Sequence, residues 1–302
     1  MPEYEAPELS HLHPSMRDAA RLPANERVEL IRADRWIGYP RAVEAVARLE
    51  TLLCWPDKQR MPNLLLIGPT NNGKSMIVEK FRRGHLPVTE ASRENTPVLC
   101  VQMPSEPSVL RFYIALLAAL GAPLQPRRRL ADVEQISLKL LRSTGVRMLV
   151  IDELHNVLAG QGNSRREFLN LLRFLGNELR MPIIGVGTRE AYLAVRSDDQ
   201  LENRFEPIVL PLWNMGEDTL SLLASFAVAL PLQRPSDIAT SDMAQYLLTR
   251  SEGTIGELTR LLTTAAIAAV ESGEECINRR TLAMADYAGP AERRRLFERE
   301  LM

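Results

Sequence analysis

The stretch that most constrains the fold runs from residue 63 to residue 81, NLLLIGPTNNGKSMIVEKF. A continuous apolar run ends at Gly68, a polar turn follows, and Gly73, Lys74 and Ser75 open an amphipathic run. The spacing G-x-x-x-x-G-K-[ST] between a strand and a helix is the pattern of a phosphate-binding loop. Unsatisfied backbone N–H groups at such a turn attract phosphate, so the stretch predicts a site for a nucleoside triphosphate.

The positions of this loop have expected contacts. The Lys74 ammonium should reach the β- and γ-phosphates, and the Ser75 hydroxyl should be a ligand of Mg²⁺. The predicted nucleotide contacts cover the loop and the start of the helix, and they are Gly68, Pro69, Thr70, Asn71, Asn72, Gly73, Lys74, Ser75 and Met76.

A second chemistry-bearing element is LVIDE, 149–153, where a buried strand ends in two carboxylates. A charge is costly at such a place unless it is used. Asp152 is expected to hold the water shell of Mg²⁺, and Glu153 to polarise the attacking water as general base. A GTPase would carry Gly after this Asp and an N-K-x-D motif, and the sequence has neither. It therefore favours an ATPase that uses ATP and Mg²⁺.

Five continuous apolar runs are expected to form the strands of a sheet. Apolar residues follow one another in each run, which is typical of strands covered on both faces. Amphipathic patterns separate the runs, with one clear helix expected over 164–179. Strands alternating with helices predict an α/β fold with a five-stranded parallel sheet flanked by helices. The runs span 63–68, 97–103, 147–154, 182–188 and 206–212.

After the fifth run the strand signals stop, and the remaining chain has helical patterns only. This change predicts a second, all-helical domain that follows the α/β domain. The start of the chain has the composition of a loosely packed arm that could contain a helix, and its end mixes charges at helical spacing. The predicted parts are an arm over 1–30, an ATPase domain over 31–212, a helical lid over 213–289 and a charged tail over 290–302.

The composition limits the class of protein. The formal net charge is −1, so a nucleic-acid partner would have to be bound by local patches. The three cysteines lie in no metal-binding or disulfide spacing. No signal peptide begins the chain, and its most apolar window, 113–124, is too short to span a membrane. These features predict a cytoplasmic protein with no membrane contact.

The order of these elements resembles that of AAA+ ATPases, a class of P-loop NTPases. WIGYPRAVEAVARL, 36–49, is similar to the stretch that closes over adenine in the initiator-like branch. On that resemblance Ile37, Gly38 and Tyr39 line the base pocket. Thr188 falls where the family has its first sensor, which helps to orient the lytic water.

Two further segments extend the AAA+ resemblance. LENRF, 201–205, resembles the segment whose arginine projects into the neighbouring subunit, so that Arg204 would act as an arginine finger. GTIGELTRLL, 253–262, resembles the lid helix of the second sensor, but Arg260 lies about a turn beyond the usual arginine position. The identity of the second sensor is therefore open. An arginine finger implies that ATP binds between subunits of a homo-oligomer.

Three runs resemble a narrower family, the transposon ATPases called TniB, which are related to the phage Mu B protein and to TnsC. They are DRWIGYPRAVEAVARLE, MPNLLLIGPTNNGKSMIVEKF and LVIDELHN. The resemblance implies an ATP-dependent, mostly sequence-nonspecific assembly on double-stranded DNA, either a ring or a helical filament. It also implies slow, regulatory ATP hydrolysis in the bacterial nucleoid. The assembly would recruit and stimulate a separate DDE-type transposase for target-site selection, with or without a target-selector protein.

DNA contacts would need Lys or Arg side chains presented along a groove and repeated on each protomer. A stacked oligomer multiplies such weak contacts. On the 164–179 helix and just beyond it, Arg166, Arg173 and Arg180 recur every seven residues, opposite the apolar face. The candidate DNA contacts are Arg111, Arg127, Arg128, Arg129, Arg165 and Arg166.

Two other functions stay open on the sequence. One is a loader or initiator-type remodeller of the same fold that acts on a protein partner in replication. An initiator usually adds a DNA-binding module after the lid, and this chain ends about 12 residues beyond it. The other is a slow ATP switch that barely hydrolyses its ligand. A Glu153→Gln variant separates an enzyme from such a switch.

Overall fold

A computed structural model describes residues 8–90, 93–123 and 129–301 of the chain. The chain divides into two compact units. The α/β unit is Arg41–Pro211, and the helical unit combines Met1–Pro40 with Leu212–Met302. No helix among the described residues combines the length and the apolar character needed to cross a bilayer.

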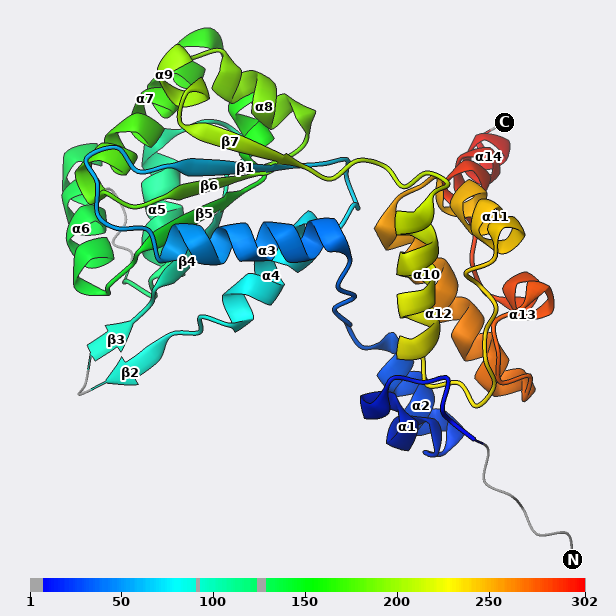
Figure 1. The fold of residues 1–302 in the computed structure, drawn as a ribbon. Coiled ribbons are helices and arrows are strands. Elements are labelled where there is room, and N and C mark those ends of the chain that lie inside the picture. The colour runs from blue at the N-terminus through cyan, green and yellow to red at the C-terminus, as the bar shows by residue number, and fades with distance from the viewer. Residues whose placement is uncertain (1–7, 91–92, 124–128, 302) are drawn as a thin grey trace, which may run out of the picture. The chain divides into compact units, whose positions relative to one another are not determined.

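The α/β unit contains the five-stranded parallel sheet that the apolar runs predict (Figure 1). The strand order is β4-β5-β6-β1-β7. All residues of β1 and β6 are buried, in agreement with strands covered on both faces. The strands are β1 (Asn63–Ile67), β4 (Val98–Gln102), β5 (Met148–Asp152), β6 (Ile183–Gly187) and β7 (Phe205–Val209).

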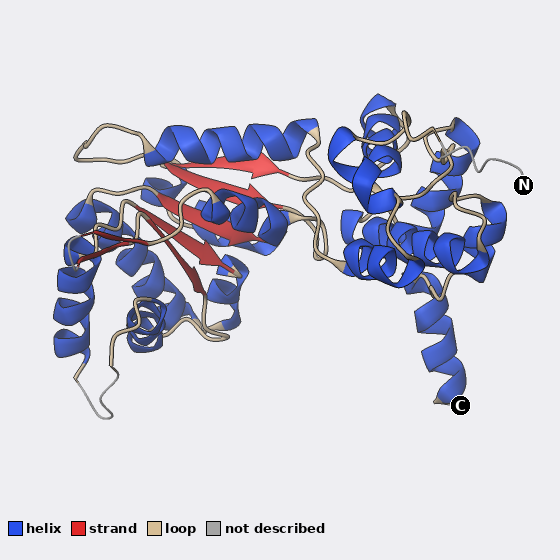
Figure 2. Cartoon of the chain, turned by 90° about the horizontal axis from the view of Figure 1, so that it is seen from below, coloured by secondary structure: helices blue, strands red, loops and turns tan. Residues whose placement is uncertain are grey.

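Helices flank this sheet, as the strands and helices of Figure 2 show. The helix predicted over 164–179 is α7, and its apolar face enters the core, where Phe168 meets Phe112 edge to face at 5.1 Å between ring centroids. The helices of the unit are α3 (Pro40–Leu53), α4 (Lys74–Arg83), α5 (Val109–Ala119), α6 (Leu130–Ser143), the 3₁₀ helix η1 (Leu154–Ala159), α7 (Gly162–Leu179), α8 (Arg189–Arg196) and α9 (Asp199–Glu202).

A short antiparallel hairpin, β2 (Val88–Glu90) and β3 (Arg93–Asn95), forms a separate sheet that the sequence does not predict. Its two three-residue strands carry the sequences VTE and REN. Such short polar strands have too few apolar residues to show a period.

The helical unit contains the all-helical region that the sequence predicts after the sheet. Its helices are α1 (Pro14–Ala20), α2 (Ala24–Arg32), α10 (Glu217–Ala229), α11 (Ser241–Ser251), α12 (Ile255–Ser272), α13 (Arg279–Met284) and α14 (Pro290–Glu300). Helix α14 has no buried residue, as its mixed charges indicate.

The N-terminal segment differs from the loosely packed arm expected from its composition. Val28 and Ile31 of α2 are buried. The Arg27 guanidinium donates to both carboxylate oxygens of Glu275, at 2.6 and 2.7 Å, and both side chains are largely buried. The pairing joins residues 248 positions apart, so no local pattern of the sequence indicates it.

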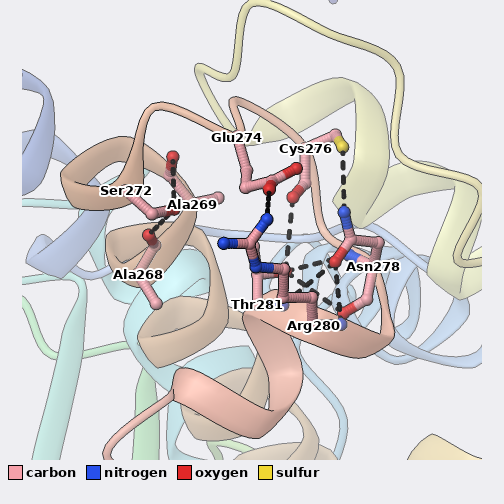
Figure 3. Close-up of polar contacts among 8 residues, drawn as sticks. All are labelled: Ala268, Ala269, Ser272, Glu274, Cys276, Asn278, Arg280 and Thr281. Atoms are coloured by element: carbon pink, nitrogen blue, oxygen red, sulfur yellow. Dashed lines mark hydrogen bonds and ion pairs between the residues drawn. The ribbon is translucent and has the colours of Figure 1, made fainter.

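The loop between α12 and α13 is held by its own side chains, which Figure 3 shows. Asn278 and Thr281 form a capping box at the start of α13. The Arg280 guanidinium donates to Glu274 at 2.6 Å. These contacts flank Glu275, whose left-handed backbone (φ 57°) would otherwise be costly to fix.

Candidate functional site

The phosphate loop begins where β1 leaves the sheet and ends at the first turn of α4. Gly73 is the residue before α4 and has φ 85°, a conformation that favours glycine. Gly68 approaches the segment after β7 so closely that a Cβ there would lie 2.8 Å from the Leu210 carbonyl oxygen. These two glycines are therefore required by the path of the loop.

Asn72 attaches this loop to the segment after β7. Its side-chain amide donates to the carbonyl oxygens of Leu210, at 3.0 Å, and Pro211, at 2.9 Å, and the residue is 2% exposed. Its side-chain amide thus holds the loop, a role that depends on a residue 138 positions away. The contact of Asn72 with the nucleotide, predicted from the sequence, stays a prediction.

Lys74 lies back across the loop. Its ammonium donates to the carbonyl oxygens of Gly68, at 2.8 Å, and Pro69, at 2.7 Å. Burial lowers the pKa of Lys74, while the nearby carboxylates of Glu153 and Asp152 oppose that shift. The loop lysine and the two acidic residues predicted from the sequence thus lie close enough for their charges to interact.

Asp152 is the last residue of β5 and Glu153 directly follows the strand, at the same edge of the sheet. Asp152 accepts a hydrogen bond from the Glu153 backbone N–H at 2.8 Å. Glu153 has a left-handed backbone (φ 57°), which redirects the chain into η1. A side-chain oxygen of Glu153 lies 3.1 Å from His155 Nε2.

Thr188, the predicted first sensor, follows β6 and precedes α8. Its hydroxyl donates to Glu190, and this bond is the main cause that lowers the pKa of Glu190. The N–H of Gly68 donates to the Gly187 carbonyl at 3.1 Å, so the exits of β1 and β6 are fixed to each other. Thr188 therefore lies at the carboxyl edge of the strands, where open α/β sheets bind ligands.

A hollow of about 560 Å³ opens beside the phosphate loop, and its lining is mostly apolar. Tyr192, Val209 and Leu210 line it, and none of them is among the site residues predicted from the sequence. Leu210 directly follows the last strand, and its position after a strand is the one sequence signal that would have placed it at this edge. The hollow has a size typical of ligand sites.

The oxygen ligands at this edge fit Mg²⁺. No group of three or more His, Cys, Asp or Glu residues in the described part of the chain could hold a metal ion alone. Mg²⁺ in phosphate-transfer sites needs no such group, because it is usually bound by one or two protein oxygens and by substrate phosphates. The Ser75 hydroxyl and the Asp152 carboxylate are ligands of that kind.

Arg204 lies at the opposite edge of the sheet. It precedes β7, and its carbonyl accepts the N–H of Asn63, the first residue of β1. Its guanidinium donates to Asn177 at 2.8 Å. The length of β1, about 16 Å, separates this edge from the loop that follows the strand. Arg204 is therefore separated from the phosphate loop of its own chain.

The other residues predicted to bind nucleotide belong to the helical unit. Tyr39 is 6% exposed and packs edge to face on Trp213 at 5.0 Å between ring centroids. The Arg260 guanidinium lies 5.9 Å from the centre of the Tyr287 ring. The roles of Ile37, Gly38, Tyr39 and Arg260 at the nucleotide stay predictions.

The predicted DNA contacts differ in what they touch. Arg111 lies 3.9 Å from Glu106, while Arg173 is 3.5 Å from Asp198 and Arg180 is 3.6 Å from Asp57. The last two are thus engaged in ion pairs and do not form the free basic row that their spacing suggests. Three side chains have no ion pair within the described residues, and they are Arg129, Arg165 and Arg166. Arg127 and Arg128 lie outside the described residues.

The chain is similar to known proteins in both sequence and structure. A family model described as "Bacterial TniB protein" matches residues 27–215. The ORC2 protein of Aeropyrum pernix has a similar structure, with a TM-score of 0.58 and 16% identity over 85% of this chain and 70% of that chain. Cdc6p of Pyrobaculum aerophilum has a TM-score of 0.56 and 15% identity, over 82% of this chain and 68% of that chain. The ORC1 protein of Aeropyrum pernix, solved with DNA, has a TM-score of 0.54 and 17% identity, over 85% of this chain and 68% of that chain. These likenesses establish an AAA+ fold with a helical C-terminal region.

Proposed function

The chain belongs to the bacterial TniB family, and from that premise we propose that it is an ATP-driven AAA+ regulator of DNA transposition. One observation carries the proposal: the phosphate loop with Lys74 follows β1, and Asp152 and Glu153 lie at the end of β5, at the same edge of the parallel sheet. ATP is the substrate, bound by the loop. The hollow lined by Tyr192 and Leu210 accommodates part of the same molecule.

The residues at the carboxyl edge of the sheet suit ATP hydrolysis. Glu153 takes a proton from water, whose oxygen forms a bond to the γ-phosphorus while the bond to the bridging oxygen breaks. The electron pair leaves with ADP, and inorganic phosphate is the second product. Thr188 helps to orient the water. Ser75 and Asp152 would hold Mg²⁺, which would neutralise part of the phosphate charge.

Arg204 suits a role on ATP bound to a neighbouring copy, since it lies at the other edge of the sheet from its own loop. A guanidinium supplied in trans stabilises the charge that develops on the transferred phosphoryl group. ATP then joins subunits into a ring or a filament, and slow hydrolysis loosens that assembly.

In this proposal the assembly forms on duplex DNA. It contacts the DNA phosphates and has no strong preference for a sequence. The unpaired arginines Arg129, Arg165 and Arg166 are the strongest of the candidate contacts. A DDE-type transposase, which cuts and joins the DNA, is the proposed protein partner. A position in the bacterial cytoplasm on the nucleoid follows from these partners.

The test is binding to a random-sequence duplex with ATP, ADP or a non-hydrolysable analogue, combined with electron microscopy of the particles. We expect ordered assemblies with ATP and with the analogue, and none with ADP. Lys74→Ala should abolish both assembly and turnover, whereas Lys80→Ala, an exposed lysine of the same helix, serves as matched control and should behave as wild type. ATP turnover without nucleotide-dependent DNA binding would instead favour a remodeller of a protein partner.

A further inference from the structure

A second hollow, of about 550 Å³, lies in the α/β unit at the edge of the sheet opposite the phosphate loop. One wall is the connection from α3 to β1, with Trp55, Lys58 and Arg60. The other wall is α9 and the turn before β7, with Asp199, Gln200 and Arg204. Since β1 and β7 are paired neighbours, their amino-terminal ends bring the two walls together.

The charges around this hollow are not balanced. Lys58, Arg60 and Arg204 are cationic, and Asp199 is the one carboxylate in the lining. Within the described residues Arg60 has no hydrogen bond or ion pair, and the Arg204 guanidinium bonds only to the neutral side chain of Asn177.

The environment of Arg204 shows the effect of this imbalance. Partial burial lowers the pKa of Arg204, and the positive charges of Arg60 and Arg173 lower it further. Nearby acids are engaged elsewhere, because Asp57 pairs with Arg180 and Asp198 with Arg173. A desolvated cation beside like charges is unfavourable unless an anion joins it.

Trp55, which lines the same hollow, has an unused donor. Its indole Nε1 is buried and has no hydrogen-bond partner in the described part of the chain. Buried polar groups are normally paired, and each exception requires an explanation. The Lys58 ammonium lies 5.5 Å from the centre of the Trp55 ring. The hollow therefore offers several cations to one ligand, with an aromatic ring beside one of them.

We propose that this hollow receives the terminal phosphate of ATP bound to a second copy of the chain, and that Arg60 is a second cation acting in trans beside Arg204. The inference rests on the proposed function, because it requires ATP between subunits. Two guanidinium forks match a phosphoryl group with several oxygens better than a single point charge would. The half-buried position of Arg204 favours a ligand that enters a concavity over a DNA strand that passes across a surface.

The first test compares steady-state ATP turnover of Arg60→Ala with wild type, without DNA and with DNA. Loss of a preorganised donor to the transferred group should lower turnover on the order of 100-fold. Arg60→Lys, which keeps the charge but loses the fork, should fall between. Arg83→Ala is the matched control, since Arg83 is an exposed arginine of the same unit that shares its partner Glu79 with Arg82. Circular dichroism checks that each variant is folded.

The second test shows in which subunit Arg60 acts. Arg60→Ala protomers are mixed in equal amounts with Glu153→Gln protomers, which hold ATP but lack the general base. On random mixing about a quarter of the sites combine an intact Glu153 with an intact Arg60 from the neighbour, so about a quarter of wild-type turnover should return. A residue that acts within its own subunit gives no recovery.

Three results overturn the inference while leaving the proposed function intact. They are wild-type turnover in Arg60→Ala, a mixture that stays as slow as Arg60→Ala alone, and weaker DNA binding with unchanged turnover in the absence of DNA. The last result would assign the hollow to a DNA phosphate. A failure of the proposed function itself gives a different result. Wild-type protein would then show no ATP turnover, or only turnover that Lys74→Ala leaves unchanged.

Discussion

Glu153, the proposed general base, has a left-handed backbone. Its φ of 57° is rare for a residue with a long side chain, and such strain concentrates at functional sites. The hydrogen bond from its N–H to the Asp152 carboxylate stabilises this turn. Asp152 thus ends the buried strand while Glu153 begins the turn into η1, so the two carboxylates can take separate roles.

The contact between Glu153 and His155 leads to a prediction for catalysis. His155→Ala removes the group 3.1 Å from the carboxylate, so the base loses the contact that fixes its direction. We expect the turnover number for ATP to fall about tenfold, the size of one lost hydrogen bond to a charged group, with little change in KM. Steady-state kinetics at saturating ATP measures both values.

The control for this prediction is His85→Ala. His85 also pairs with a glutamate, Glu50, at 2.8 Å, but neither residue belongs to the candidate site. Its turnover should match wild type. Rescue by His155→Gln, which can donate to the same oxygen, would identify His155 as a positioning residue, and full activity in His155→Ala would show that Glu153 needs no such support.

At the scale of elements, helix α14 is joined to α12 by one largely buried carboxylate. Glu257 of α12 accepts hydrogen bonds from Arg293, at 2.7 Å, and from the Tyr287 hydroxyl, at 3.0 Å. Burial pushes the pKa of Glu257 up, but the bonds from Arg293 and Tyr287 together outweigh burial, and the net direction is down. The charged form is therefore favoured in the folded protein.

Glu257→Gln should lower the free energy of unfolding at pH 7 by about 2 kcal/mol, since it weakens a charge-assisted network. A carboxyl group with a depressed folded-state pKa contributes stability above its unfolded pKa, about 4.3, and loses that contribution as the pH falls through the folded value. The difference between variant and wild type should therefore shrink in acid. Urea unfolding at several pH values from 7 down to about 3 measures it, because the loss occurs below the unfolded pKa.

Glu252→Gln is the matched control, because Glu252 also contacts α14, through Arg294, but at an exposed position. Exposed pairs contribute at most about 1 kcal/mol, so this variant should unfold close to wild type. A Glu257→Gln difference that is independent of pH would mean that its effect comes from packing and not from charge.

The elements also show what a sequence can predict. The five strands and the phosphate loop follow from local runs of residues, and they lie where the sequence places them. Contacts between distant positions have no local signal, as with Asn72 and Leu210 or Arg27 and Glu275. The base pocket and second sensor were assigned by resemblance, and the residues concerned lie in the helical unit, so their roles stay predictions.

At the scale of the whole molecule, the α/β unit carries two chemically different edges. The carboxyl ends of its strands hold the phosphate loop, Asp152 and Thr188, while the amino ends hold Arg204 and Arg60, which has no ion pair among the described residues. In the proposed assembly, a nucleotide bound at the first edge of one copy would complete the second edge of another. ATP would then be both substrate and connection between subunits, and its hydrolysis would control assembly.

This coupling predicts that assembly and turnover respond differently to Glu153→Gln. The variant keeps the phosphate loop and both edges, but its amide cannot accept the proton from the attacking water. We expect turnover to fall by at least 100-fold, while ATP-dependent assemblies on duplex DNA form as in wild type and persist much longer. Turnover is measured by phosphate release and persistence by light scattering after ATP is diluted. A wild-type protein whose assemblies dissociate as slowly as those of the variant would be a nucleotide switch, because hydrolysis would then not be what releases its subunits.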